Sequence, residues 1–218
     1  GCGVVKMPRG GYDGKGVRVV SGAAEAADWF AAVAGDPAGD ALLVEELVDF
    51  RRELAQLVAR RPSGEVRHWP VVETVQIDGV CAEVFAPAPK ASARLLEVAG
   101  EIGDAIVSGL GVTGVMAVEL FETSDDRLLV NELAMRPHNS GHHTIDACAV
   151  SQYDQQVRAL CGLPLGEPRQ HSASVMVNLL GELGFEGGDP HGRYREPDWS
   201  VLHAVPGLRL HLYAKHHA

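Results

Sequence analysis

Two acidic residues stand inside otherwise apolar runs of this chain. Glu119 lies in the run Val112–Phe121. Glu132 lies in the run Leu128–Leu133, and the polar turn ETSDDR joins the two. Apolar runs bounded by turn residues predict two buried strands that pair as an antiparallel hairpin. A buried carboxylate is costly unless it meets a cation or hydrogen-bond donors. Two of them on neighbouring strands therefore predict a shared divalent metal, and ligation by oxygen alone favours magnesium.

A polar loop follows this hairpin directly. Its sequence, RPHNSGH at positions 136–142, contains no apolar anchor. A loop of this composition beside paired carboxylates predicts a reaction centre. Two other readings stay open on the residues alone. The acids could be ordinary strand-edge residues, and His138, His142 and His143 could form a zinc cluster, although the neighbouring carboxylates favour a hard metal.

The first twenty residues contain a second candidate site. Gly3–Lys6 is strand-like, and MPRGGYDGKGVRVV follows as a glycine-rich hairpin. Glycines let the main chain approach a ligand closely, and N–H groups at such a turn can hold phosphate. The stretch does not fit the Walker A pattern, which needs Ser or Thr at Gly16, and no helix follows as in a Rossmann fingerprint. Taken alone, a hairpin of this kind is more often only a turn.

Composition excludes several classes of protein. The chain has 218 residues, of which 46% are hydrophobic and 22% charged, as in ordinary globular proteins. A formal net charge of −10 argues against a nucleic-acid partner, and no apolar run is long enough to cross a membrane. Four cysteines without C-x-x-C spacing predict free thiols and a cytoplasmic protein. Abrupt ends, without an initiator methionine, suggest a fragment of a longer chain.

The remaining segments predict a mixture of strands and helices, an α+β fold. The stretch Arg51–Arg61 is ambiguous, because its propensity is helical and its context strand-like. A turn at Asp78-Gly79 should join two of the strands. Helices are predicted for Ala23–Ala34, Ala91–Leu110 and Ser151–Cys161. Strands are predicted for Ala41–Val48 (buried), Val66–Val75, Val80–Phe85, Ala173–Leu180 and Leu208–Tyr213.

Several of these segments together resemble one enzyme family. VVKMPRGGYDGKG, LLVEELVDFRRE, WPVVETVQIDG, GVMAVELF, LLVNELAMRPHNSGHHT, SQYDQQVRALCGLPLG and SVMVNLLGE occur in this order over nearly the whole chain. They resemble the ATP-grasp enzymes, and among them the 5-(carboxyamino)imidazole ribonucleotide synthases of purine biosynthesis. GGYDGKG together with NELAMRPHNSGH is highly specific. The resemblance also favours a strand at Arg51–Arg61.

The resemblance implies a fold and an activity. Two α+β lobes, at residues 1–48 and 49–170, would grip ATP, and a small, incomplete β-rich segment would follow at 171–218. The family uses ATP and Mg²⁺ to join bicarbonate to aminoimidazole ribonucleotide, giving the N-carboxylated ribonucleotide, ADP and phosphate. Relatives also carry an N-terminal nucleotide-fold domain and a basic segment after LYAK, which this sequence does not contain. A homodimer is an open option.

The resemblance also implies a role for individual residues on the nucleotide side. Lys6 would bind the phosphates, the hinge from Glu45 would bind the adenine edge, and Glu53 would hold the ribose hydroxyls. Gln76 stands where relatives often carry a histidine. Glu119 and Glu132 would hold the magnesium ion. The nucleotide-binding residues would be Lys6, Gly11, Tyr12, Asp13, Gly14, Lys15, Gly16, Val17, Glu45, Glu46, Leu47, Val48, Glu53, Gln76, Asn131 and Glu132.

On the acyl side, the resemblance implies that Arg136, His138 and Asn139 handle bicarbonate and its phosphorylated form. Tyr12 and Asp13 would contact the aminoimidazole, and Lys215 its ribose phosphate. His143 replaces an aromatic residue common in the family, which favours a structural role.

Two alternatives of different kinds remain. Formate-dependent glycinamide ribonucleotide transformylase, another ATP-grasp ligase, typically shows R-P-H-D-T-G, whereas this chain has Asn139 and Ser140 in the corresponding places. The chain could also be a non-catalytic nucleotide-binding module.

Overall fold

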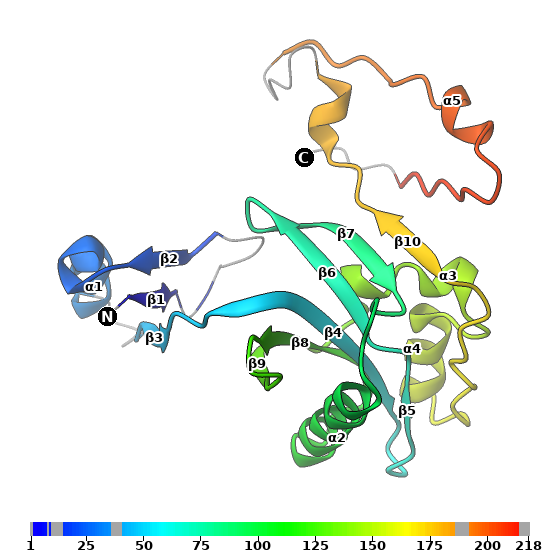
Figure 1. Cartoon of the computed structure of the whole chain (residues 1–218), viewed down its shortest axis with the longest axis horizontal. Helices are drawn as coiled ribbons and strands as arrows, with labels where there is room; N and C mark the ends of the chain where they lie inside the picture. Colours follow the sequence, from blue (N-terminus) through cyan, green and yellow to red (C-terminus); the bar gives the residue numbers. More distant parts are fainter. Residues whose placement is uncertain (1, 8, 10–14, 36–40, 186–191, 214–218) are drawn as a thin grey trace. The chain divides into compact units, whose positions relative to one another are not determined.

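The computed structural model describes residues 2–7, 9, 15–35, 41–185 and 192–213 (Figure 1). The chain divides into two compact units, Gly1–Met176 and Val177–Ala218. The first unit contains two separate sheets. Among the described residues, no helix combines the length and the apolar character needed to span a membrane.

A small antiparallel sheet comes first in the chain. Its strands are β1 (Gly3–Lys6), β2 (Val17–Val20) and β3 (Leu43–Glu46), in the order β2-β1-β3. The predicted hairpin of β1 and β2 is confirmed. The predicted helix begins as a 3₁₀ turn, η1 (Ala23–Ala26), and continues as α1 (Ala27–Ala34).

The prediction that Ala41–Val48 is a buried strand is wrong in one respect. A strand forms there, but the side chains of Leu43 and Val44 are 53% and 57% exposed. The described core of this sheet is a small cluster built on Val5, Val20 and Ala26. No residue of β3 belongs to this cluster, which lies on β1, β2 and η1, so the apolar run of β3 packs against no described core.

The larger sheet forms the body of the first unit. Its order is β10-β7-β6-β4-β8-β9, with β5 paired to β4. The strands are β4 (Phe50–Arg60), β5 (Val66–His68), β6 (Val72–Ile77), β7 (Val80–Ala86), β8 (Gly114–Thr123), β9 (Leu128–Ala134) and β10 (Ser174–Val177). The strand at Arg51–Arg61 is thus confirmed as β4. Its residues 54–59 are all buried, because helices cover both faces of the sheet at this point.

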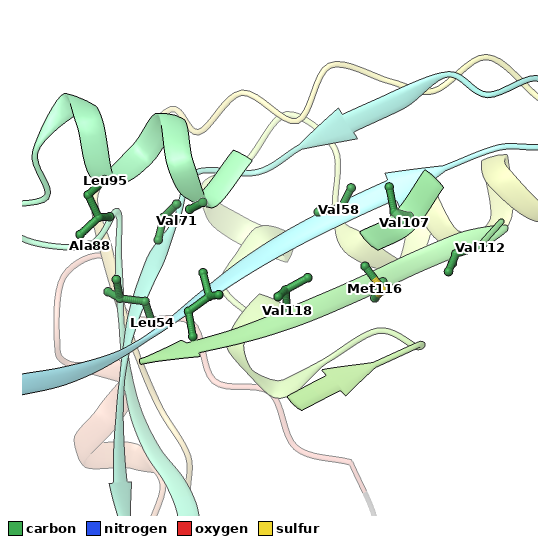
Figure 2. Packing of buried hydrophobic residues seen from close by; sticks show 11 residues of the cluster. Leu54, Val58, Val71, Ala88, Leu95, Val107, Val112, Met116 and Val118 are labelled. Carbon is green, nitrogen blue, oxygen red and sulfur yellow. The ribbon is translucent and has the colours of Figure 1, made fainter. Parts of the chain in front are cut away.

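Helices pack on the two faces of this sheet. Helix α2 (Ala93–Gly109), whose N-terminus Ser92 caps, covers the face that carries Leu54, Val58 and Met116 (Figure 2). Helix α4 (Gln152–Leu160) and the short α3 (Thr144–Ala147) follow the polar loop, in which η2 (Asn139–Gly141) lies. The α4 side buries Leu57, Ala117 and Ala159. The apolar residues of β8 are therefore anchored in the core on both faces of the sheet.

The predicted strand Val66–Val75 is interrupted at residues 69–71, which include Trp69 and Pro70. Trp69 is 1% exposed, and its indole Nε1 donates to Val150 O at 3.0 Å. Proline has no N–H for a ladder, so the chain leaves β5 here and re-enters the sheet as β6. The predicted turn at Asp78-Gly79 is confirmed, with φ angles of 52° and 79°.

A pair of arginines ties β4 to β8 beside the site. Glu122 is 1% exposed and accepts hydrogen bonds from Arg51 and from Arg52. Burial works to raise the pKa of Glu122, but the two arginine hydrogen bonds outweigh it and hold the pKa below its ordinary value. Arg52 also donates to Pro89 O at 2.6 Å. The start of β4, where Glu53 lies, is thereby fixed to its neighbour.

The C-terminal segment from residue 173 contains less strand than predicted. Ala173–Leu180 is a strand only over β10, and the predicted strand at Leu208–Tyr213 is wrong, since these residues have no regular structure. A segment with an alternating apolar pattern becomes a strand only where a neighbouring strand can pair with its backbone. The described part of the tail contains only η3 (Gly181–Gly184), α5 (Ser200–His203) and one bridge, Phe185 with Tyr194. The domain boundaries themselves stay a prediction.

Candidate active site

The predicted antiparallel hairpin is confirmed, and it pairs the two acids directly. The prediction that both strands are buried is wrong for β9, in which no residue is buried and Glu132 is exposed. Only Leu128 and Ala134 of this strand pack against the core clusters. In the ladder of β8 with β9, Glu119 is the register partner of Glu132. Side chains of opposed residues on one face lie about 5 Å apart at Cβ. The pKa of Glu132 is raised, first by loss of water around the carboxyl and then by the charge of Glu119. Two carboxylates this close together favour the binding of a cation by one or both of them.

A β-bulge shapes the end of this hairpin. The register passes from Glu119 with Glu132 to Leu120 with Val130, so Asn131 is an extra residue on β9. In a regular strand, Asn131 and Glu132 would point to opposite faces, but a bulge re-aims side chains. Lys6 Nζ donates to Asn131 Oδ1 at 3.4 Å, and the positive charge of Lys6 acts on Glu132 to lower its pKa. Asn131 therefore contacts Lys6 directly, and Glu132 lies close enough for the charge of Lys6 to act on it.

Lys6, the last residue of β1, brings a cation to these acids. Its Nζ lies 2.6 Å from Glu45 Oε2, and the two side chains are 19% and 38% exposed. The strand β3 that carries Glu45 pairs directly with β1. The small sheet thus supplies a partly buried ammonium group beside Asn131 of the large sheet.

His138 lies between the polar loop and the acid pair. Its Nε2 is 3.1 Å from Glu119 Oε1, and its Nδ1 lies 2.9 Å from Ser140 Oγ and 3.4 Å from Ser140 N. Because a carboxylate only accepts, the contact with Glu119 requires a proton on Nε2 that is directed at the carboxylate. The side chains of His138 and Glu119 are only 12% and 16% exposed. The imidazole therefore donates to one of the two predicted metal ligands.

Arg136 and Asn139 flank this histidine. Arg136 is exposed, its Nη1 donates to Pro137 O at 3.1 Å, and its charge acts to lower the pKa of Glu132. Asn139 begins η2, and its carbonyl accepts from His142 N at 3.1 Å. Arg136 and His138 are thus both brought to the acid pair.

Glu53, Gln76 and Cys81 form a further edge of the site. Burial raises the pKa of Glu53, the charges of Glu119 and Glu132 raise it further, and a hydrogen bond from Gln76 opposes them. Cys81 is the register partner of Gln76, and its pKa rises to about 11, first through burial and then through the charges of Glu119 and Glu53. Sequence reasoning missed Cys81. The turn at Asp78-Gly79, which sets the hairpin register, is the signal that could have placed it.

The remaining predicted residues are placed as follows. Gly16 has a φ of 78°, and its carbonyl oxygen accepts a hydrogen bond from Met7 N at 2.8 Å. Lys15 precedes it, and Val17 is the first residue of β2. Glu46 ends β3, and Leu47 and Val48 link it to the start of β4. The positions of Gly11, Tyr12, Asp13, Gly14 and Lys215 lie outside the described residues.

The alternative of a zinc cluster is wrong for the part of the chain that the structure describes, where no group of three or more metal-ligating side chains occurs. The three imidazoles have separate partners. His138 meets Glu119, His142 Nδ1 lies 2.9 Å from Tyr153 Oη, and His143 Nδ1 lies 3.1 Å from Ser140 O. Two carboxylates alone still fit magnesium, which commonly takes one or two carboxylates together with substrate phosphates and water.

Comparison with known proteins defines the class. Residues 2–153 match the family model described as ATP-grasp domain. The chain therefore belongs to the ATP-grasp family. Residues 174–218 match a second model, described as phosphoribosylaminoimidazole carboxylase C-terminal domain.

Individual relatives narrow the class. An N5-carboxyaminoimidazole ribonucleotide synthase of Mycobacterium leprae is 52% identical over 223 residues, which cover 97% of this chain and 48% of that protein. A synthetase structure from Thermus thermophilus is 34% identical with a TM-score of 0.77, covering 94% of this chain and 50% of that one. A synthase from Aspergillus clavatus in complex with ADP and 5-aminoimidazole ribonucleotide is 32% identical with a TM-score of 0.72, covering 82% and 46%. The chain spans about half the length of the curated relatives that it matches.

Proposed function

We propose that this chain is the ATP-binding and carboxyl-transferring part of a 5-(carboxyamino)imidazole ribonucleotide synthase. The reaction joins bicarbonate to aminoimidazole ribonucleotide at the expense of ATP. The observation that carries the proposal is the line of contacts from Lys6 through Asn131 and the acid pair to His138. In this line Lys6 contacts Asn131 and His138 contacts Glu119, which supports a phosphate-binding role for the lysine and an acyl-side role for the histidine. The substrate is inferred from the relatives described above.

On the nucleotide side, Lys6 would leave Glu45 and pair with phosphate oxygens. Glu119 and Glu132 would hold Mg²⁺, which when bound offsets the charge of the β- and γ-phosphates. Glu53 lies on β4 at the edge of the same site, where a carboxylate can accept from ribose hydroxyls. Charge neutralisation and positioning are the main catalytic needs of phosphoryl transfer.

On the acyl side, a bicarbonate oxygen attacks the γ-phosphorus and ADP leaves, giving carboxyphosphate. This mixed anhydride breaks to CO₂ and phosphate, and the ribonucleotide amine attacks CO₂ and loses a proton. Arg136 offers a planar fork of donors that matches the anions. His138 would donate to the same anions or take the amine proton. Water must be kept out, since it would hydrolyse the anhydride.

An assay of ADP release in the full-length protein tests the proposal. We expect release to require bicarbonate and to rise with aminoimidazole ribonucleotide, with one carboxylated product formed for each ADP. Activity with glycinamide ribonucleotide and formate instead would identify a transformylase. Nucleotide binding without ADP release under any of these conditions would identify a binding module. The same proposal places the enzyme in the cytoplasm, and sedimentation of the full-length protein would test for a homodimer.

A further inference from the structure

One buried side chain holds the main chain of His138. Gln152, the first residue of α4, is 0% exposed. Its Oε1 accepts from His138 N at 2.8 Å, and its Nε2 donates to His138 O at 2.8 Å. The carboxamide thus satisfies both polar groups of one peptide residue, and this pairing fixes which way the amide points.

The same side chain reaches the other end of the loop. Nε2 of Gln152 lies 3.2 Å from His142 Nδ1. A carboxamide nitrogen only donates, so His142 Nδ1 is the acceptor and the ring proton of His142 is on Nε2. The main-chain N of Gln152 donates to Thr144 Oγ1 at 2.9 Å, and that hydroxyl donates to Gly141 O at 2.6 Å. One residue therefore fixes residues 138–142 from both ends.

The loop packs closely against Gln152 and the sheet. A Cβ placed on Gly141 would overlap Gln152 Oε1 and Leu57 Cδ2. Leu57 lies on the central strand β4 and is 0% exposed. The loop therefore rests directly on the sheet, and a change in the Gln152 carboxamide must be transmitted to His138.

We propose that Gln152 is a positioning residue for carboxyl transfer, which keeps the His138 imidazole at Glu119. The proposal rests on the proposed function. His138 Nε2 is 3.1 Å from Glu119 Oε1, so a small rotation of the His138 main chain breaks this contact. The residues assigned to ATP belong to β1, β2, β3, β4, β6 and β9 or to the segments 11–16 and 47–48, and none of them belongs to the loop that Gln152 holds. Loss of the Gln152 carboxamide should therefore impair the acyl-side steps of the reaction and leave nucleotide binding unchanged.

Gln155 supplies a matched control on the same helix. It is also 0% exposed, its Oε1 accepts from Gly166 N at 2.8 Å, and its Nε2 donates to Gly166 O at 2.8 Å. The same chemical unit thus makes the same pair of backbone contacts, but to a segment that carries no predicted site residue. A general effect of removing a buried carboxamide should therefore appear equally in variants of Gln152 and of Gln155.

The test compares Gln152→Glu with Gln155→Glu in the full-length protein. An ionised carboxylate keeps the acceptor and loses the donor. We expect both variants to lose stability, but only Gln152→Glu to lower carboxylation by roughly 10²-fold, the scale of an approximately 1 Å misplacement. ADP released for each product should rise several-fold in that variant alone, and its affinity for a non-hydrolysable ATP analogue should stay within about twofold of wild type.

An unchanged ratio of ADP to product in Gln152→Glu, or an equal rise in Gln155→Glu, would overturn the proposal. Should Gln152→Glu not fold, Gln152→Asn, which keeps the carboxamide on a shorter stem, is read in the same way. Nitrogen NMR of the wild-type histidine rings gives a check without any variant, since a protonated Nδ1 on His142 would contradict the geometry. A wild type that releases ADP without forming product overturns the proposed function instead.

Discussion

At the scale of single residues, the main feature of the site is the negative charge of the acid pair, which the neighbouring positive groups offset only in part. Glu119 and Glu132 oppose each other, and the described side chains of Lys6, Arg136 and His138 lie near them. The pKa of Glu132 is raised in spite of these three, because burial and Glu119 outweigh them. A divalent ion bound by both carboxylates would offset their charges.

Replacing either acid by its amide should therefore cripple turnover. We expect Glu119→Gln and Glu132→Gln to lower magnesium-dependent activity of the full-length protein by roughly 10²-fold or more, because each removes a metal ligand and its charge. Stability should change little or rise, since a repulsive contact is relieved. A titration of activity with magnesium measures this. Wild-type activity of both variants across the titration would show that the pair is structural.

Arg136 and His138 should act on the other side of the reaction. We expect His138→Ala to lower carboxylation by roughly 10²-fold, the usual scale for a lost acid–base group. Arg136→Lys should fail as well, because a point charge lacks the planar fork that binds two oxygens at once.

Calorimetry with a non-hydrolysable ATP analogue separates the two sides of the site. Nucleotide affinity should stay near that of wild type in both variants. If affinity falls together with turnover, Arg136 and His138 belong to the ATP side.

At the scale of elements, the loop that carries η2 and α3 depends on close packing. Gly141 in η2 has no space for a side chain, since a Cβ would overlap Leu57 and Gln152. Gly141→Ala should destabilise the protein by about 1–3 kcal/mol through overpacking. Gly100→Ala is the control, because this glycine lies inside α2 with nothing within 4 Å of an added Cβ. That substitution should stabilise by about 0.5–1 kcal/mol. Equal effects in thermal unfolding would contradict the packing argument.

His143 in the same loop should make stability depend on pH. It is 7% exposed, and burial lowers its pKa from 6.5 to about 4. Below pH 6.5 the unfolded chain takes up a proton that the folded chain refuses, so stability is complete above this pH and is lost as pH falls towards 4. Between pH 7.5 and 5 the loss from this group should be about 2 kcal/mol.

The matching variant is His143→Phe, which cannot titrate. Urea unfolding measures the free energy of unfolding at pH 7.5 and pH 5. Between these two values the variant should lose about 2 kcal/mol less stability than the wild type, whatever its stability at pH 7.5. His203→Phe, at an exposed position in α5, serves as the control and should keep the wild-type dependence. The same pH dependence in His143→Phe would contradict the assignment.

At the scale of the whole molecule, nucleotide should be held by groups from both sheets of the first unit. Lys6 comes from the small sheet, and Asn131 and the acids come from the large one. Lys6→Met should weaken binding of an ATP analogue by roughly 10- to 10²-fold, the scale of a lost charge-assisted hydrogen bond. It should also reduce the rise in Tm on adding the analogue with Mg²⁺.

Without nucleotide, Lys6→Met should change Tm little, since a partly exposed ion pair contributes little to stability. Arg18→Met is the control. Arg18 pairs with Asp28 at 2.6 Å on the same small sheet, and its loss should leave nucleotide affinity unchanged. An equal loss of affinity in both variants would mean that Lys6 acts only by stabilising the sheet.

Much of this architecture follows from the sequence through local rules. Apolar runs and turns predicted the hairpin of the acids, the helices α2 and α4 and the turn at Asp78-Gly79, because side-chain alternation and capping act over a few residues. The candidate site residues on the acid hairpin and the loop at 136–142 were also visible as polar groups in unusual places. Assigning them to ATP and bicarbonate depended on resemblance.

Tertiary structure decided the rest. The register that opposes Glu119 to Glu132, and the bulge that turns Asn131 towards Lys6, depend on how two strands pair along their whole length. The exposure of β3 and the irregular chain at 208–213 depend on which layers and neighbours are present, which an apolar pattern does not encode. The hold of Gln152 on His138 joins residues 14 apart through a loop without regular pattern. Periodicity in a sequence reports which face of an element is apolar, whereas the partner of a polar side chain is chosen by the packing of the whole fold.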